Sequence, residues 1–173
     1  MSEIVDLYND NGKIIGKVEK NEAHHKGLLH KTIHVWILNK NKELLLQKRC
    51  AKKDYFPLYW DVSIGGHIKS GEEPIECAIR EAKEELGLSL NKEDFKYLFT
   101  VKEELTYKDI NCKEFADVFL IRKDIKLEDL KYQEDEVENS KFIKLEEFFK
   151  ICNSKYYFPH TEEYKKLNKY LLN

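Results

Sequence analysis

The segment from Pro74 to Leu86 is the strongest constraint on what this chain can fold into. Pro74 suits the first turn of a helix, and Gly87 suits the residue that follows the last turn. At about 100° per residue, the apolar side chains of this segment fall on one stripe, made of Ile75, Ala78, Ile79, Ala82 and Leu86. The sequence therefore predicts a helix over residues 74–86 that packs against a core along one side.

Three glutamates lie on another face of this predicted helix. Glu81, Glu84 and Glu85 are spaced so that their carboxylates are neighbours, and Arg80 can reach Glu84 one turn further on. Adjacent carboxylates repel one another unless a cation lies among them, and carboxylate oxygens are the ligands that Mg²⁺, Mn²⁺ and Ca²⁺ prefer. A run of charges is also typical of a solvated helix surface, so the helix alone does not decide between the two interpretations.

The residues before the helix favour the metal site. Gly66 is followed after five residues by Glu72, and after seven more by the run Arg80-Glu81-Ala82-Lys83-Glu84-Glu85-Leu86-Gly87-Leu88. This pattern resembles the Nudix box, which reads G, five residues, E, seven residues and REUXEEXGU, where U is a bulky aliphatic residue. Every fixed position matches, and the soft departure is Ala82 at the first U.

The resemblance implies an enzyme that hydrolyses a nucleoside diphosphate linked to another group. It implies that Glu81, Glu84 and Glu85 bind Mg²⁺ (or Mn²⁺) and act in catalysis. A metal suits this reaction because it neutralises phosphate oxygens and lowers the pKa of water. Which glutamate is the general base, how many metal ions bind and which diphosphate is the substrate stay open.

Three further residues of the box have supporting roles in this interpretation. Gly66 permits a tight turn and a close approach of the backbone at the entrance of the helix, and its carbonyl is an additional candidate ligand. Glu72 can pair with Arg80 and so hold the loop against the helix. The pair would then keep the loop and the glutamates around one metal.

The resemblance extends beyond the box to the Nudix branch that contains isopentenyl-diphosphate isomerases and the hydrolases similar to them. It covers roughly residues 4–150 and rests on the segments 30–39, 44–49, 59–61, 65–67 and 114–119. The fold that it implies is of the α/β class, a Nudix-type α/β/α sandwich with a mixed β-sheet.

Two other functions stay as alternatives to the hydrolase. The isomerase carries a cysteine just before the box glycine, where this chain has Gly65, and it builds a second metal site from three histidines and two glutamates. The counterparts of that site are His30, His67 and Glu114, with His24 or His25 and Cys112 at approximate positions. A non-catalytic nucleotide-binding Nudix module usually loses the box glutamates. The missing thiol and the complete box favour the hydrolase.

Substrate contacts are expected from basic and imidazole side chains. Glu114, on the strand predicted to face the box helix, is a candidate for a further metal ligand or base. Arg49 and Lys53 belong to a basic cluster before the aromatic pair Tyr55-Phe56, which predicts a diphosphate clamp, although a solvated loop has the same composition. His30 and His67 are candidates for phosphate contact, with a structural role as the alternative. His34 and His160 are weaker candidates.

The rest of the chain is expected to form one Nudix domain over residues 1–173. Residues 1–28 are predicted as an N-terminal hairpin extension, with strands at Ile4–Leu7 and Ile14–Val18, and residues 145–173 as C-terminal helices. The helices are expected at 145–152 and 162–172. Further strands are expected at 33–37, 44–46, 62–68, 95–105, 115–121 and 141–143.

Composition limits the classes of partner. The chain has 173 residues and a formal net charge of −2, which argues against binding to nucleic acid or to a membrane surface. It has no apolar run long enough to span a bilayer and no secretory signal at its start, so a cytoplasmic location is expected. The scattered cysteines Cys50, Cys77, Cys112 and Cys152 are expected to be free thiols. The partner is a small diphosphate substrate, and a homodimer is left open.

Overall fold

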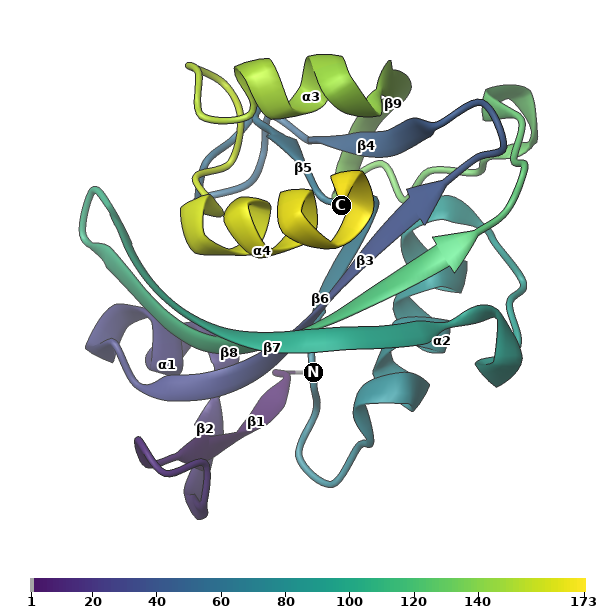
Figure 1. Cartoon of the computed structure of the whole chain (residues 1–173). Coiled ribbons are helices and arrows are strands. Elements are labelled where there is room, and N and C mark those ends of the chain that lie inside the picture. Colours follow the sequence, from purple (N-terminus) through teal and green to yellow (C-terminus); the bar gives the residue numbers. More distant parts are fainter. Residues whose placement is uncertain (1) are drawn as a thin grey trace.

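The structure is a computed structural model that describes residues 2–173 (Figure 1). Its strands are β1 (Ile4–Tyr8), β2 (Ile14–Glu19), β3 (Leu29–Leu38), β4 (Glu43–Arg49), β5 (Trp60–Asp61), β6 (Ile64–His67), β7 (Lys96–Tyr107), β8 (Ile110–Arg122) and β9 (Val137–Lys144). Its α-helices are α1 (Lys20–Lys26), α2 (Pro74–Leu86), α3 (Leu145–Ile151) and α4 (Thr161–Leu172). Short 3₁₀ turns occur at Lys92–Asp94 and Leu127–Asp129.

The main sheet is mixed, because β3 runs parallel to β8 and antiparallel to its other partners. Its central order is β5-β4-β3-β8-β7, while β6 pairs with β3 and β9 pairs with β4. The register of β3 places His30 beside Glu114 of β8, and Thr32 beside His67 of β6. Four side chains from three strands are therefore brought together by the pairing of the strands.

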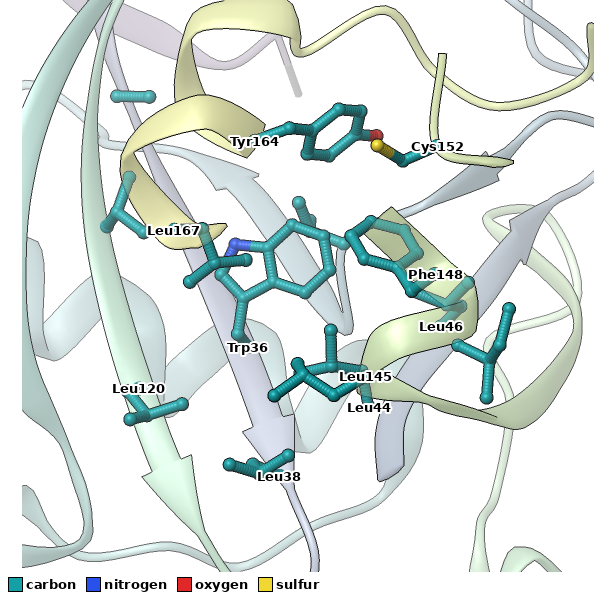
Figure 2. Close-up of a cluster of buried hydrophobic side chains, with 14 of the residues drawn as sticks. Trp36, Leu38, Leu44, Leu46, Leu120, Leu145, Phe148, Cys152, Tyr164 and Leu167 are labelled. Atoms are coloured by element: carbon teal, nitrogen blue, oxygen red, sulfur yellow. The ribbon is translucent and has the colours of Figure 1, made fainter. Parts of the chain in front are cut away.

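Helices cover both faces of this sheet, which confirms the predicted α/β/α sandwich (Figure 1). Strand β3 is buried on both sides: Trp36 and Leu38 pack under α3 and α4, whereas Ile33, Val35 and Ile37 pack under α2. Figure 2 shows the first of these cores, in which the ring of Trp36 lies between the residues of α3 and α4. The sandwich fixes α2 on one face and the C-terminal helices on the other.

Helix α2 has the bounds that its capping residues predict. The side chain of Glu73 accepts a hydrogen bond from the backbone N–H of Glu76, and the side chain of Glu76 accepts one from the backbone N–H of Glu73. Gly87 ends the helix with φ 69°. The buried stripe differs in part from the predicted one: Ile75 and Ile79 are only partly buried. Cys77 and Glu85 are buried on this helix, although neither belongs to the predicted stripe.

The N-terminal hairpin is confirmed, and it forms a separate two-stranded sheet whose turn places Gly12 at φ 75°. Helix α1, which follows it directly, was not predicted. Its sequence has no apolar stripe, and Ala23 is its buried residue. Most strands of the main sheet extend beyond their predicted ends by a few residues, most clearly at the hairpin of β7 and β8. The strand predicted at 62–68 is shorter than expected, because β6 covers Ile64–His67.

Candidate active site

The predicted site residues surround a cavity of about 510 Å³, lined by α2, β4, β6, β7, β8 and the segment that follows β4. The predicted residues in its wall are Arg49, Lys53, Gly66, His67, Arg80, Glu81, Glu84, Glu85 and Glu114. Glu72 and His30 do not line the cavity, but each contacts a residue that does. Glu72 is bonded to Arg80, and His30 Nε2 lies 3.5 Å from Glu114 Oε1. The fold therefore gathers the whole set in one region.

The three glutamates of α2 differ in their exposure. Glu85 is 6% exposed, and its Oε2 accepts hydrogen bonds from Gln47 Nε2 at 2.8 Å and from the Gly65 backbone N–H at 3.2 Å. Glu81 is partly buried, and the Glu84 side chain is 47% exposed. The carboxylates thus run from the interior of the cavity to its rim, along the helix face that the sequence predicted.

Arg80 connects the helix to the preceding loop. Its Nε and Nη2 donate to the two carboxylate oxygens of Glu72 at 2.8 and 2.9 Å, a bidentate pair. Its Nη1 donates to Glu81 at 2.6 Å and to Glu84 at 3.2 Å, and Nη2 also donates to the His67 carbonyl at 3.2 Å. One guanidinium thereby fixes the loop and two of the three glutamates.

The backbone at Gly66 touches the side chain of Glu81. A Cβ atom built at Gly66 would overlap Glu81 Cγ, so a side chain at this position would displace the carboxylate. Burial raises the pKa of Glu81 to about 7. Burial, and then the charge of Glu81, raises the pKa of Glu85 well above its usual range. A cation among these oxygens would favour the ionised forms, which makes the cluster chemically suited to a hard divalent ion.

A second cluster joins three imidazoles and one carboxylate: His24, His30, His67 and Glu114. His24 Nε2 and His67 Nε2 lie 2.9 Å apart, and His67 Nε2 and His30 Nε2 each lie 3.5 Å from Glu114 Oε1. His30 donates from Nδ1 to the Leu28 carbonyl at 2.8 Å, which leaves its buried Nε2 without a partner. This is the tautomer that a metal-binding histidine adopts.

Burial favours the neutral form of His24 and His67. Burial also opposes the charged form of His30, but the contact with Glu114 outweighs it and raises the pKa of His30. Burial and the neighbouring His67 lower the pKa of His24 to about 3, and burial lowers the pKa of His67 to about 4. Cys112 contributes its thiol, which lies 2.7 Å from Glu114 Oε1. Neutral imidazoles with a carboxylate suit Zn²⁺, Mn²⁺ or Fe²⁺, so this cluster can hold a transition metal.

The predicted diphosphate clamp is already paired within the protein. Arg49 donates to Asp61 at 3.1 Å and to the Tyr55 carbonyl at 2.7 Å, and Lys53 forms an ion pair with Glu136. Both basic side chains nevertheless line the cavity. Their role in binding substrate stays a prediction, and their internal partners show that they also hold the segment after β4.

A buried charged network that the sequence did not reveal lies on the side of the cavity next to α4. His34 Nδ1 lies 2.6 Å from Glu163 Oε2. His160 contacts Glu103 through Nδ1 at 2.7 Å and Asp61 through Nε2 at 2.9 Å. Burial opposes the charged form of both imidazoles, but the facing carboxylates outweigh it and raise the pKa of His34 and of His160. The two histidines therefore balance carboxylates.

The comparisons with known proteins agree with this geometry. The NUDIX domain family model matches residues 28–164. An uncharacterized Nudix hydrolase of Clostridium acetobutylicum is 33% identical over 88% of this chain and 75% of its own length. Isopentenyl-diphosphate Delta-isomerase 1 of Photorhabdus laumondii is 32% identical over 94% of this chain and 88% of its own. A crystal structure of a Deinococcus radiodurans protein superposes with a TM-score of 0.74 at 20% identity, over 95% of this chain and 98% of that one, a likeness of fold.

A sandwich with a complete glutamate box on α2 defines a hydrolase of diphosphate bonds. The chain belongs to the Nudix family, and its enzyme class, that of the Nudix hydrolases acting on nucleoside diphosphate derivatives, confirms the prediction made from the box. Enzymes of this family generally use a divalent metal. Within residues 2–173, no helix combines the length and the apolar character needed to cross a membrane.

Proposed function

We propose that the protein hydrolyses a nucleoside diphosphate linked to another group, using Mg²⁺ or Mn²⁺ held by Glu81, Glu84 and Glu85. The observation that carries this proposal is that Glu81, Glu84 and Glu85 share one face of α2, where the guanidinium of Arg80 bonds to two of them. Their carboxylate oxygens suit a hard cation. When bound, the cation supplies the charge that stabilises phosphate oxygens and acidifies a nucleophilic water.

The protein's own residues position these groups. Gly66 allows the backbone to approach Glu81, while Glu72 and Arg80 hold the loop on the helix. Glu85 is held from the sheet side by Gln47. Because each carboxylate is fixed before substrate arrives, little reorganisation is needed when charge develops on the diphosphate.

Isomerisation of isopentenyl diphosphate is the second candidate function, and the His24, His30, His67 and Glu114 cluster favours it. The residue in the position of the isomerase thiol is Gly65, which argues against it. Of the two cysteines that could replace that thiol, Cys77 lies on the buried face of α2 and packs in the core, whereas Cys112 lines the cavity. Burial raises the pKa of the Cys112 thiol, which disfavours the reactive thiolate.

A direct experiment separates these two activities. Purified protein is incubated with Mg²⁺ or Mn²⁺ and a panel of nucleoside diphosphates, nucleotide sugars and dinucleotides, with isopentenyl diphosphate in parallel, and the products are identified by mass. We expect metal-dependent release of phosphate or a nucleoside monophosphate and no dimethylallyl diphosphate. Full activity after exhaustive chelation, or isomerisation at enzymatic rates, would contradict the proposal.

The Glu72 and Arg80 pair gives a second prediction. Glu72→Gln removes the charge that holds the guanidinium of Arg80, so we expect activity at limiting Mg²⁺ to fall by about 10- to 100-fold, as for other residues that support metal ligands. Raising Mg²⁺ should recover part of the loss. Glu128→Gln, an exposed carboxylate of the 3₁₀ turn at Leu127–Asp129, is the control and should stay near wild type. An unchanged rate at limiting Mg²⁺ would show that Glu72 does not support metal binding through Arg80.

Several features of this enzyme stay as predictions from the sequence. They are its organisation as one domain over residues 1–173, its cytoplasmic location, the absence of binding to nucleic acid or membranes, and the open question of a homodimer. The non-catalytic alternative is disfavoured because the glutamates that such modules usually lose are all present. Hydrolysis of a small diphosphate is the function that the site supports best.

A further inference from the structure

Two buried polar atoms in the wall of the cavity have no partner within the part of the protein that the structure describes. They are the Tyr55 hydroxyl and Glu103 Oε1. Neither belongs to the glutamate cluster of α2 or to the histidine cluster around Glu114. Unpaired polar atoms are uncommon in protein interiors because burying them costs free energy. Two such atoms in one cavity suggest a ligand that completes them.

The free oxygen of Glu103 is held in place by a chain of charged contacts. The other oxygen, Oε2, lies 2.7 Å from His160 Nδ1, and His160 Nε2 lies 2.9 Å from Asp61. Asp61 in turn accepts a hydrogen bond from Arg49 at 3.1 Å. The Glu103 side chain is therefore fixed in position, and its charge is already balanced by the imidazole. Its free oxygen is a preorganised acceptor rather than an uncompensated anion.

The Tyr55 hydroxyl is positioned by the segment after β4. Arg49 donates to the carbonyls of Tyr55 and Phe56, and Phe56 has a left-handed backbone with φ 48°. The ring of Tyr55 packs 5.6 Å from the ring of Phe158 and 6.3 Å from that of His24, measured between centroids. The ring is thus held next to His24 of the histidine cluster and next to Phe158, which stacks on His160 of the charged network that contains Glu103.

The chemistry of these atoms selects the group that can bind there. A hydroxyl can donate to Glu103 Oε1 and accept from the Tyr55 hydroxyl, either as one group or as two neighbouring ones. A hydrocarbon chain can do neither and would leave both atoms unpaired. An ammonium group could donate to both oxygens, but it would add a positive charge beside His160 and Arg49, which already pair with Glu103 and Asp61. An ionised phosphate oxygen only accepts hydrogen bonds, so a second phosphate would leave Glu103 Oε1 unpaired.

We propose that Tyr55 and Glu103 form a subsite for sugar hydroxyls, and that they bind the pentose attached to the diphosphate of the substrate. The proposal rests on the proposed function, in which the diphosphate lies at the glutamates of α2. The subsite would select nucleoside diphosphates over prenyl diphosphates. It therefore gives a physical reason for hydrolase chemistry in a branch of the family that also contains isomerases.

The test measures binding rather than turnover. Calorimetry with Mg²⁺ compares ADP, 2′,3′-dideoxyADP, which lacks two hydroxyls, and dimethylallyl diphosphate. Wild-type protein should bind ADP about tenfold more tightly than the dideoxy analogue, the size of one to two hydrogen bonds. Tyr55→Phe should abolish that preference and leave the affinity for dimethylallyl diphosphate unchanged. Because the hydroxyl has no internal partner, this variant should fold as the wild type does.

The control is Tyr97→Phe, which removes a hydroxyl bonded to Thr100 on an exposed part of β7 and should keep the preference. No preference in the wild type, a preference that persists in Tyr55→Phe, or tighter binding of dimethylallyl diphosphate would overturn the subsite. These outcomes concern binding alone. A protein that prefers ADP without hydrolysing any diphosphate would support the subsite and contradict the proposed function. A protein that hydrolyses a diphosphate without this preference would support the proposed function and contradict the subsite.

Discussion

Glu85→Gln should lower kcat/KM for diphosphate hydrolysis by at least about 100-fold, because it removes one charged ligand from the centre that stabilises the reacting phosphate. Glu85 is the most buried of the three glutamates, and Gln47 and the Gly65 backbone N–H bind the same oxygen, Oε2. Because this position is buried, we do not expect a water molecule to replace the lost carboxylate as a ligand. The measurement is steady-state kinetics at saturating Mg²⁺.

The fold should survive this substitution. Burial raises the pKa of Glu85, so the protonated acid is the form that the surroundings favour when no cation is bound, and glutamine has nearly the same shape. The melting temperature should therefore stay close to that of the wild type. Glu146→Gln, on the exposed side of α3, is the matched control and should leave both rate and stability unchanged. Wild-type rates in Glu85→Gln would exclude Glu85 from metal binding.

The local signals in the sequence predicted the fold well where structure is decided within a few residues. Helix α2 begins at Pro74 and ends before Gly87, because capping is a short-range property. Helix α1 was missed because its seven residues bury only Ala23 and are stabilised by contacts with β8 and β2. The residues at 33–37 predict a strand, but the burial of both its faces was not predicted, because it depends on the helices that cover the two sides of the sheet.

The same distinction applies to the site: contacts between residues close in the sequence could be predicted, and contacts made by tertiary packing could not. The box residues form one stretch of sequence, so their spacing was enough to predict the pairing of Glu72 with Arg80 and a close approach of the backbone at Gly66. That Gly66 touches the side chain of Glu81 was not predicted. The network around Glu163 depends on contacts across more than a hundred residues, as between His34 and Glu163. No local pattern marks such a pair. Only the packing of α4 against the sheet brings these side chains together.

Glu163→Ala should lower the free energy of unfolding by about 3–5 kcal/mol, the usual cost of removing one partner from a buried ion pair. Glu163 is fully buried, and its two oxygens lie 2.6 Å from His34 Nδ1 and 2.7 Å from Trp36 Nε1. The substitution would leave an uncompensated imidazole and an unpaired indole N–H in the core. It would also release the contact that holds α4 on β3, so the C-terminal helix should lose protection from hydrogen exchange first.

The effect should also depend on pH. The carboxylate of Glu163 raises the pKa of His34 against the opposing effect of burial, and His34 lowers the pKa of Glu163 in the same way. The contribution of the pair is therefore full between the ordinary values of the two groups, about pH 4.3 and about pH 6.5. It is lost as the pH rises through the raised pKa of His34, or falls through the lowered pKa of Glu163.

Denaturant unfolding of wild type and Glu163→Ala across this range measures both effects. Glu162→Ala is the matched control: the neighbouring residue forms an exposed ion pair with Lys165 at 2.6 Å, and exposed pairs of this kind contribute about 0–1 kcal/mol. A loss below about 1 kcal/mol in Glu163→Ala, or a loss equal to that of Glu162→Ala, would show that His34 and Trp36 find other partners. If the expected difference is found, it follows from the burial of Glu163 and its contacts with His34 and Trp36, because Glu162 is the same residue type at the neighbouring position of the same helix.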